Sequence, residues 1–228
     1  MKITRIALLA LAGTGCFHVV HPAAYDPQNA FSRSFDRDWE FQKRIEYLPP
    51  AHGVVVLSSH NMESDVRRLI RQGYSLMGAS EFTDRIDSTW EAQLRAHATS
   101  IGAEAILIEV RLSGRAPGDS ALRAQNAVAY FARTRFRLGI LPNEVPDSTR
   151  DRLGSRYGVW VYERADDSPA GRAGIQSGDV LLQIGGEMLR SVPDFYRLLA
   201  QEEGKRVELM LDRGGRLIVK QVEIASLR

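Results

Sequence analysis

Side chains that could carry out bond chemistry are few and widely spaced in this sequence. Cys16 is the only cysteine, which excludes a disulfide framework. The Gly-x-Ser-x-Gly surroundings of a serine nucleophile are missing. The histidines also lack the spacing that a metal site requires: they are His18, His21, His52, His60 and His97. The sequence therefore predicts a protein with no catalytic residue, no metal site and no cofactor.

Main-chain groups can also bind a ligand, and the C-terminal part of the chain holds the sequence motifs that indicate such a site. Glycine lets several N–H groups approach one carboxylate closely, and the chain offers such a residue in Arg137-Leu-Gly-Ile140. Further motifs follow in order: Gly158-Val-Trp-Val-Tyr162, Ser168-Pro-Ala-Gly-Arg-Ala-Gly-Ile175 and Ser177-Gly-Asp-Val-Leu-Leu-Gln-Ile184. In this order and spacing, residues 136–225 resemble a PDZ domain of the bacterial HtrA/Deg type.

The resemblance implies a peptide-binding groove. Leu138-Gly139-Ile140 matches the position of the family's carboxylate-binding loop, and the strand that begins there would pair with an incoming peptide. A helix over 192–203 would form the opposite wall. Its apolar residues are too many for one buried face, so some would face the core and others the groove: Val192, Phe195, Tyr196, Leu198 and Leu199. The sequence leaves open which do which.

The local signals for this domain stand without the family name. Ser168-Pro169 and Ser191-Val192-Pro193 are helix starts, with serine as the cap and proline in the first turn. Alternating strands are predicted over 158–165, 206–212 and 216–223, and an apolar strand over 180–184. We expect a PDZ-like β-sandwich with two helices over 136–228.

Residues 51–135 are predicted to form a separate small α/β sandwich domain of unknown role. Strands are expected over 53–57, 74–82, 104–112 and 127–136, with helices starting near Asn61 and Ser88. The order β-α-β-α-β-β suggests one sheet with helices against a face. The fold class of the whole chain is therefore α+β.

The N-terminal residues resemble a bacterial lipoprotein signal. A short basic region and an apolar stretch too short to span a bilayer precede Gly13-Thr-Gly-Cys16. The resemblance implies cleavage after residue 15 and lipid on Cys16, which would attach the protein to a membrane of the cell envelope. Phe17 after the cysteine favours the outer membrane of a Gram-negative host. An ordinary secretory signal and a buried thiol are the alternatives.

Charge argues against a nucleic-acid partner, and proline content predicts the nature of residues 16–50. The sequence has 30 basic and 28 acidic side chains, and removal of Lys2 and Arg5 with the signal leaves 28 of each, so the mature chain is formally neutral. A nucleic-acid surface would show a basic excess, and no nucleic-acid partner is expected. Residues 16–50 have no sustained period and several prolines, which predicts a solvated tether.

These features predict a lipid-anchored envelope protein whose C-terminal groove binds a partner's C-terminus or an extended segment, as an adaptor or scaffold. Two alternatives remain. One is a non-catalytic regulatory or substrate-delivery component of an envelope protease system. The other is a purely structural envelope assembly protein, in which the groove would be filled or blocked.

Overall fold

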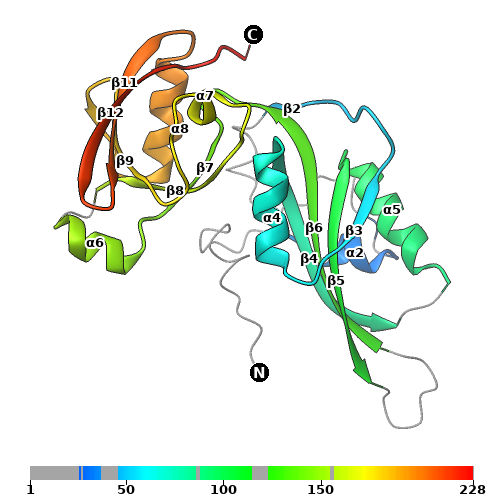
Figure 1. Ribbon diagram of the computed structural model, residues 1–228. Helices are drawn as coiled ribbons and strands as arrows, with labels where there is room; N and C mark the ends of the chain where they lie inside the picture. The colour runs from blue at the N-terminus through cyan, green and yellow to red at the C-terminus, as the bar shows by residue number, and fades with distance from the viewer. Residues whose placement is uncertain are drawn as a thin grey trace. The chain divides into compact units, whose positions relative to one another are not determined.

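Two compact units make up the part of the chain that the computed structural model describes, namely residues 26, 28–36, 46–85, 88–114, 123–154 and 157–227. The first unit is built mainly from residues before Thr134 and the second mainly from Thr134 onward (Figure 1). The predicted signal over 1–15 and Cys16 lie outside the described residues. Within the described ranges, no helix is long and apolar enough to cross a membrane.

The element order predicted for residues 51–135 is confirmed. It reads β3 (Val55–Ser58), α4 (Met62–Arg71), β4 (Tyr74–Arg85), α5 (Trp90–Ser100), β5 (Ala105–Gly114) and β6 (Arg123–Arg135). The strands form one sheet in the order β1-β4-β6-β5-β3, in which β3 and β5 are parallel and the β5–β6 and β4–β6 pairs are antiparallel. The alternation of apolar residues along β5 and β6 thus places side chains on two buried faces.

The predicted tether over 16–50 is wrong where the structure describes it before β3. This segment contains α2 (Ala30–Arg33), β1 (Phe35–Asp36) and β2 (Glu46–Tyr47), and β1 and β2 pair with β4 and β6. Phe31 is 1% exposed and Phe35 is 6% exposed, and both belong to the core of the first unit. The side chain of Asn29 caps α2 by accepting the N–H of Phe31 at 2.9 Å. These elements are too short to produce a periodic pattern, so the sequence did not reveal them.

The second unit is an antiparallel sheet in the order β12-β11-β9-β8-β7, with β10 paired to β9. Its elements are β7 (Ile140–Asn143), α6 (Asp147–Leu153), β8 (Val159–Arg164), α7 (Pro169–Arg172), β9 (Val180–Ile184), β10 (Glu187–Met188), α8 (Val192–Gln201), β11 (Arg206–Arg213) and β12 (Arg216–Glu223). The sequence predicted two helices here and missed α6. That helix buries none of its residues, so it carries no apolar stripe to detect.

Both predicted serine caps of the second unit are confirmed. Ser168 Oγ accepts the N–H of Gly171 at 3.1 Å, and Ser191 Oγ accepts the N–H of Asp194 at 3.3 Å. Each cap satisfies a main-chain donor that the first helical turn leaves without a partner. The helices α7 and α8 therefore begin where the sequence indicates. Their apolar residues enter the core of this unit beside those of β8, β9 and β11.

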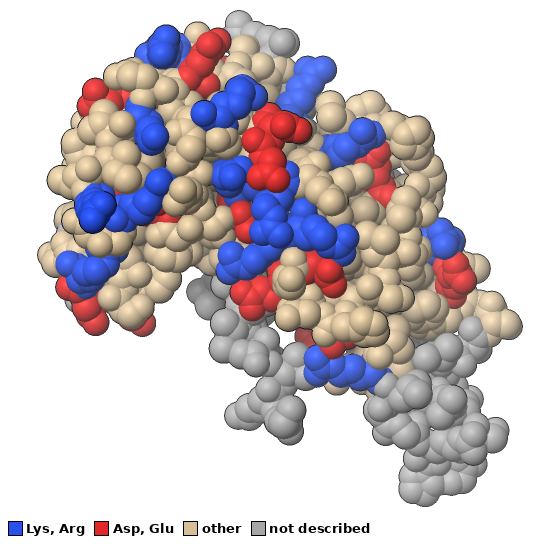
Figure 2. All heavy atoms as spheres, viewed as in Figure 1, with Lys and Arg blue, Asp and Glu red and all other residues tan. Residues whose placement is uncertain are grey.

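Charged side chains of both signs lie next to one another on the face visible in Figure 2. Asp179 and Asp212 are two of the buried carboxylates of the second unit, and each is paired with an arginine. Arg213 Nε donates to Asp179 Oδ1 at 2.7 Å, and Arg152 Nη2 lies 2.7 Å from Asp212 Oδ1. The bond from Arg152 holds the pKa of Asp212 below its usual range. These carboxylates stabilise turns, and because each is paired with an arginine, neither is available as a catalytic group.

His97 on α5 is a buried neutral base in the first unit. It is 2% exposed, and the rings of Phe35 and Tyr130 stand edge-on to it at 4.9 and 5.1 Å between centroids. Neither ring nitrogen has a hydrogen-bond partner among the described residues. Burial lowers the pKa of His97 to about 4, against a partial opposing effect of Asp26. The residue therefore packs as an apolar ring at neutral pH.

The first unit should lose stability as the solution is acidified. The pKa of His97 is lower in the folded chain than the ordinary 6.5 of the unfolded one. The stability that goes with a neutral His97 is therefore fully present above pH 6.5 and is lost as pH falls toward 4. The free energy of unfolding should fall by roughly 3 kcal/mol across this window. Hydrogen–deuterium exchange of the α5 amides against pH measures it.

His97→Leu should remove most of this pH dependence, because leucine fills the site and does not titrate. His60→Leu, at an exposed position, is the matched control and should leave the dependence unchanged. An equally steep loss of α5 protection in the His97→Leu protein would contradict the assignment.

Candidate functional site

Residues 137–139 turn their carbonyl groups toward the rest of the second unit. Each carbonyl accepts a main-chain N–H at 2.9 Å: Arg137 from Ala225, Leu138 from Ala170, and Gly139 from Ala165. In a trans peptide group the following N–H points opposite to the carbonyl, and the described chain has no cis peptide bond. The N–H groups of residues 138, 139 and 140 therefore point away from these partners. Successive donors of this kind can bind an anion such as a carboxylate.

Position 139 in this loop accepts only glycine. Its φ is +84°, in the region that side chains disfavour, and an added β-carbon would lie 2.1 Å from the Cβ of Ser168. Ser168 cannot move away easily because its hydroxyl donates to the carbonyl of Ala165 at 2.6 Å while it caps α7. The start of α7 and the loop are thus locked together. Gly139 is thus a point of close main-chain approach, and its predicted role in binding a peptide remains a prediction.

β7 follows the loop and lies at one edge of the sheet, paired with β8 on one side. The bond from Ala165 N–H to Gly139 C=O flanks the neighbouring pair of Ile140 and Arg164, and in an antiparallel ladder the residues of a pair flanked in this way do not bond to each other. Ile140 opposite Arg164 is consequently a pair without ladder bonds. The N–H and C=O of Ile140 face the open edge. An extended chain could pair with them.

α8 lies against β7 and β9. The structure shows which residues of its apolar stripe face the core, a point that the sequence left open. Phe195, Leu198 and Leu199 are buried in the core, whereas Val192 and Tyr196 are half-buried at its margin. Leu138 is likewise 1% exposed and belongs to the core.

The side chains of Leu138, Phe195 and Leu199, which the sequence offered as peptide contacts, lie in the core instead, while the main-chain N–H of Leu138 stays with the loop. A side chain that the core already covers has no surface to offer to a ligand, so these residues support the site from beneath. We call the open edge of β7 together with Ile140, Val192 and Tyr196 the β7–α8 surface. These three side chains are partly buried against the same core.

Arg133 and Arg137, near the end of β6, each form an ion pair with one of the protein's own carboxylates. Arg133 Nη2 lies 2.8 Å from Glu104 Oε1 in the first unit, and Arg137 Nε donates to Glu203 Oε2 at 2.7 Å in the second. Glu203 also accepts the N–H of Leu227 at 2.9 Å, and these bonds lower its pKa to about 2. Arg137 therefore fastens the C-terminal segment beside the loop.

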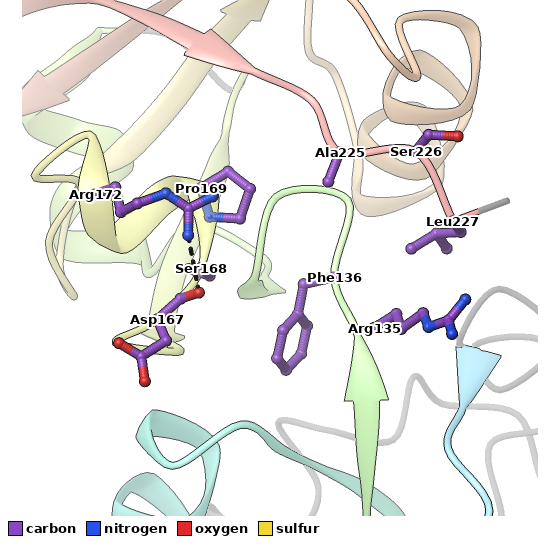
Figure 3. Close-up of a pocket in the computed structure, with 9 residues that line it drawn as sticks. All are labelled: Arg135, Phe136, Asp167, Ser168, Pro169, Arg172, Ala225, Ser226 and Leu227. Atoms are coloured by element: carbon purple, nitrogen blue, oxygen red, sulfur yellow. Dashed lines mark hydrogen bonds between the residues drawn. The ribbon is translucent and has the colours of Figure 1, made fainter.

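A hollow of about 270 Å³ lies next to the loop, outside the β7–α8 surface. Three segments form it: the end of β6, the start of α7 and the C-terminal residues (Figure 3). The lining residues are Arg135, Phe136, Asp167, Ser168, Pro169, Arg172, Ala225, Ser226 and Leu227. The sequence analysis missed this hollow because its walls come from segments far apart along the chain. Across the described ranges, no group of three metal-ligating side chains is present.

Comparison with known families agrees with the geometry of the second unit. The family model described as PDZ domain matches residues 160–213, from β8 to the end of β11. Residues 160–213 are a PDZ domain. The loop over 137–140 and β7 precede the matched residues, yet they pair with β8 and belong to the same compact unit.

Among curated proteins, the chain is 35% identical over 60 residues to a protein of Treponema pallidum (strain Nichols) named as a zinc metalloprotease. It is 30% identical over 71 residues to serine protease HTRA1 of Xenopus tropicalis. The matches cover 26% and 31% of this chain but only 13% and 15% of those proteins. The likeness is thus to one part of each protease.

Among solved structures, the HtrA3 PDZ domain bound to the phage-derived ligand FGRWV is similar to this chain. It shares 25% sequence identity and a TM-score of 0.35, and the match covers 39% of this chain and 84% of that one.

Replacement of Gly139 by alanine should destabilise the PDZ domain more than the same change at Gly186. Both glycines have a positive φ, of +84° and +86°, which costs an alanine roughly 1–2 kcal/mol. A β-carbon at 186 meets nothing within 4 Å, whereas one at 139 collides with Ser168. The clash should add about 1–3 kcal/mol.

Chemical denaturation of the two variants measures the difference. Equal losses of stability would show that residue 139 is not packed against Ser168.

Proposed function

We propose that this protein binds a peptide of a partner at the β7–α8 surface, as an added strand with its carboxylate against the loop over 138–140. The observation that carries the proposal is the outward direction of successive main-chain donors that end at Ile140, the first residue of an edge strand. PDZ domains take extended peptides in this way, with main-chain bonds for affinity and side-chain contacts for selection.

The side chains at this surface favour an apolar terminal residue in the peptide. Ile140, Val192 and Tyr196 are partly buried hydrophobic residues packed on the core. A single short strand buries little area, so the dissociation constant should be micromolar, roughly −8 kcal/mol. Such an affinity suits a reversible adaptor or scaffold.

The test uses a library of decapeptides with randomised C-terminal residues, each made with a free carboxylate and with a terminal amide. Fluorescence anisotropy should show binding of free-carboxylate peptides to the full mature chain. Val192→Glu should weaken binding about tenfold or more, because it places a charge beside the apolar terminal residue. Ala200→Glu, at an exposed position of the same helix, is the matched control. Equal binding by both variants would place the peptide elsewhere.

The proposal includes attachment to a membrane of the cell envelope through lipid on Cys16. The residues that support it are the small side chains before a lone cysteine at the end of a short apolar stretch. Acyl chains contribute about 0.8 kcal/mol for each buried CH₂, so several of them would hold the protein at a bilayer surface.

Cys16→Ser should move the protein from the membrane fraction to the soluble fraction when it is made in a lipoprotein-processing bacterium. Ser32→Ala, a change in the described part of the chain, is the control and should stay with the membrane. Mass spectrometry of the N-terminal peptide provides the direct measurement. A wild-type N-terminus that carries no lipid would refute the anchor.

A second candidate function is a non-catalytic subunit of a protease system, which either regulates the protease or delivers substrates to it. The observation that favours it is that both curated relatives named above are proteases matched over a small part of their length. Co-purification of the full chain with a peptidase from membranes would support this role. Recovery of non-peptidase partners alone would favour the adaptor.

A further inference from the structure

Pro142 occupies the second main-chain position of β7 that faces the open edge. It lies opposite Val161 after a bulge in the pairing of β7 with β8. Val161 donates to the carbonyl of Asp179 at 2.9 Å and accepts the N–H of Gly178 at 2.8 Å. Its main-chain groups are therefore directed away from β7, and the 142–161 pair has no ladder bonds. The main-chain side of Pro142 thus faces the open edge as that of Ile140 does, although the residue is buried, and proline has no N–H to donate.

The next donor along the chain is also occupied. The N–H of Glu144 donates to the side-chain Oδ1 of its neighbour Asn143 at 2.8 Å. Of positions 140, 142 and 144, the first alone offers a main-chain donor toward an added strand. The carbonyl acceptors of Ile140 and Pro142 remain on that side. At the loop end the edge thus offers both a donor and an acceptor, whereas beyond Ile140 it lacks donors.

We propose that Pro142 limits the peptide ladder, so that the β7–α8 surface recognises the last two or three residues of a free C-terminus and not an internal strand. This inference rests on the proposed function. An internal segment lacks the carboxylate that the donors of residues 138–140 would bind, and it depends on successive ladder bonds. Opposite Pro142 one peptide carbonyl finds no donor, and an unmet acceptor at a partly covered position opposes binding.

The experiment measures affinity against peptide length. The best free-carboxylate sequence from the library is synthesised as a dipeptide, tripeptide, pentapeptide and decapeptide with the same C-terminal residues. Binding to the full mature chain is measured by calorimetry. For the wild type, affinity should rise up to the tripeptide and change less than about twofold beyond it. An internal version, with residues added after the terminal one, should bind at least about tenfold more weakly.

Pro142→Val restores the missing N–H and keeps an apolar side chain at this buried position. It should strengthen binding of the pentapeptide and decapeptide about threefold to tenfold, the effect of one hydrogen bond, and leave the dipeptide unchanged. Pro146→Val, at the exposed cap position of α6, is the matched control and should change neither. Pro142→Ala serves as a second variant with less bulk. Thermal unfolding confirms that each variant is folded.

The outcomes separate the two proposals. If wild-type affinity keeps rising severalfold from tripeptide to decapeptide, or if Pro142→Val and Pro142→Ala give no gain with length, the limit at Pro142 is refuted while peptide binding stands. If no peptide of the library binds the wild-type chain, peptide binding itself fails and the limit fails with it.

Discussion

The close contact between Gly139 and Ser168 is the constraint on which the candidate site depends. Ser168 caps α7, donates to Ala165 and lies against the α-carbon of residue 139, where no side chain fits. This contact fixes the direction of the loop carbonyls and hence of the opposite N–H groups. The outward direction of these donors is therefore a consequence of tertiary packing, and it does not need a charged side chain. The paired state of Arg137 with Glu203 is consistent with that view.

An open sheet edge is useful for recognition and hazardous for aggregation, and β7 shows both aspects. Ile140 exposes a donor and an acceptor, whereas Pro142 two residues later removes a donor. Proline on an edge strand is a known means of limiting unwanted pairing. In this chain the same residue would restrict the peptide that the edge accepts. Selectivity and solubility would then have one physical origin.

The two units use their sheets differently. In the first unit the sheet has a parallel pair at one edge and takes Phe31 and Phe35 from a preceding segment into its core. Among its described residues, the buried His97 is packed in the core and the buried Glu104 forms an ion pair with Arg133. In the second unit the edge strand β7, beside α8, has an open side with which a strand of another protein could pair.

Much of the fold could be predicted from the sequence because it depends on local signals. The serine caps at 168 and 191, the strand alternation and the order β-α-β-α-β-β each follow from a few neighbouring residues. Gly139 was also predicted as the centre of the loop. The short elements α2, β1 and α6 were missed because they have no period. The tether prediction failed at Phe31 and Phe35 for the same reason.

The division of α8 into core and surface was decided by tertiary structure. Phe195 and Leu199 differ from Val192 and Tyr196 in what covers them, and a stripe of apolar residues does not encode that difference. The direction of main-chain groups along β7 was also beyond the sequence, because it depends on the pairing register with β8 and on a bulge. The sequence by itself determined which residues could donate or cap. Only the packing of distant segments decided which of those groups face an incoming chain.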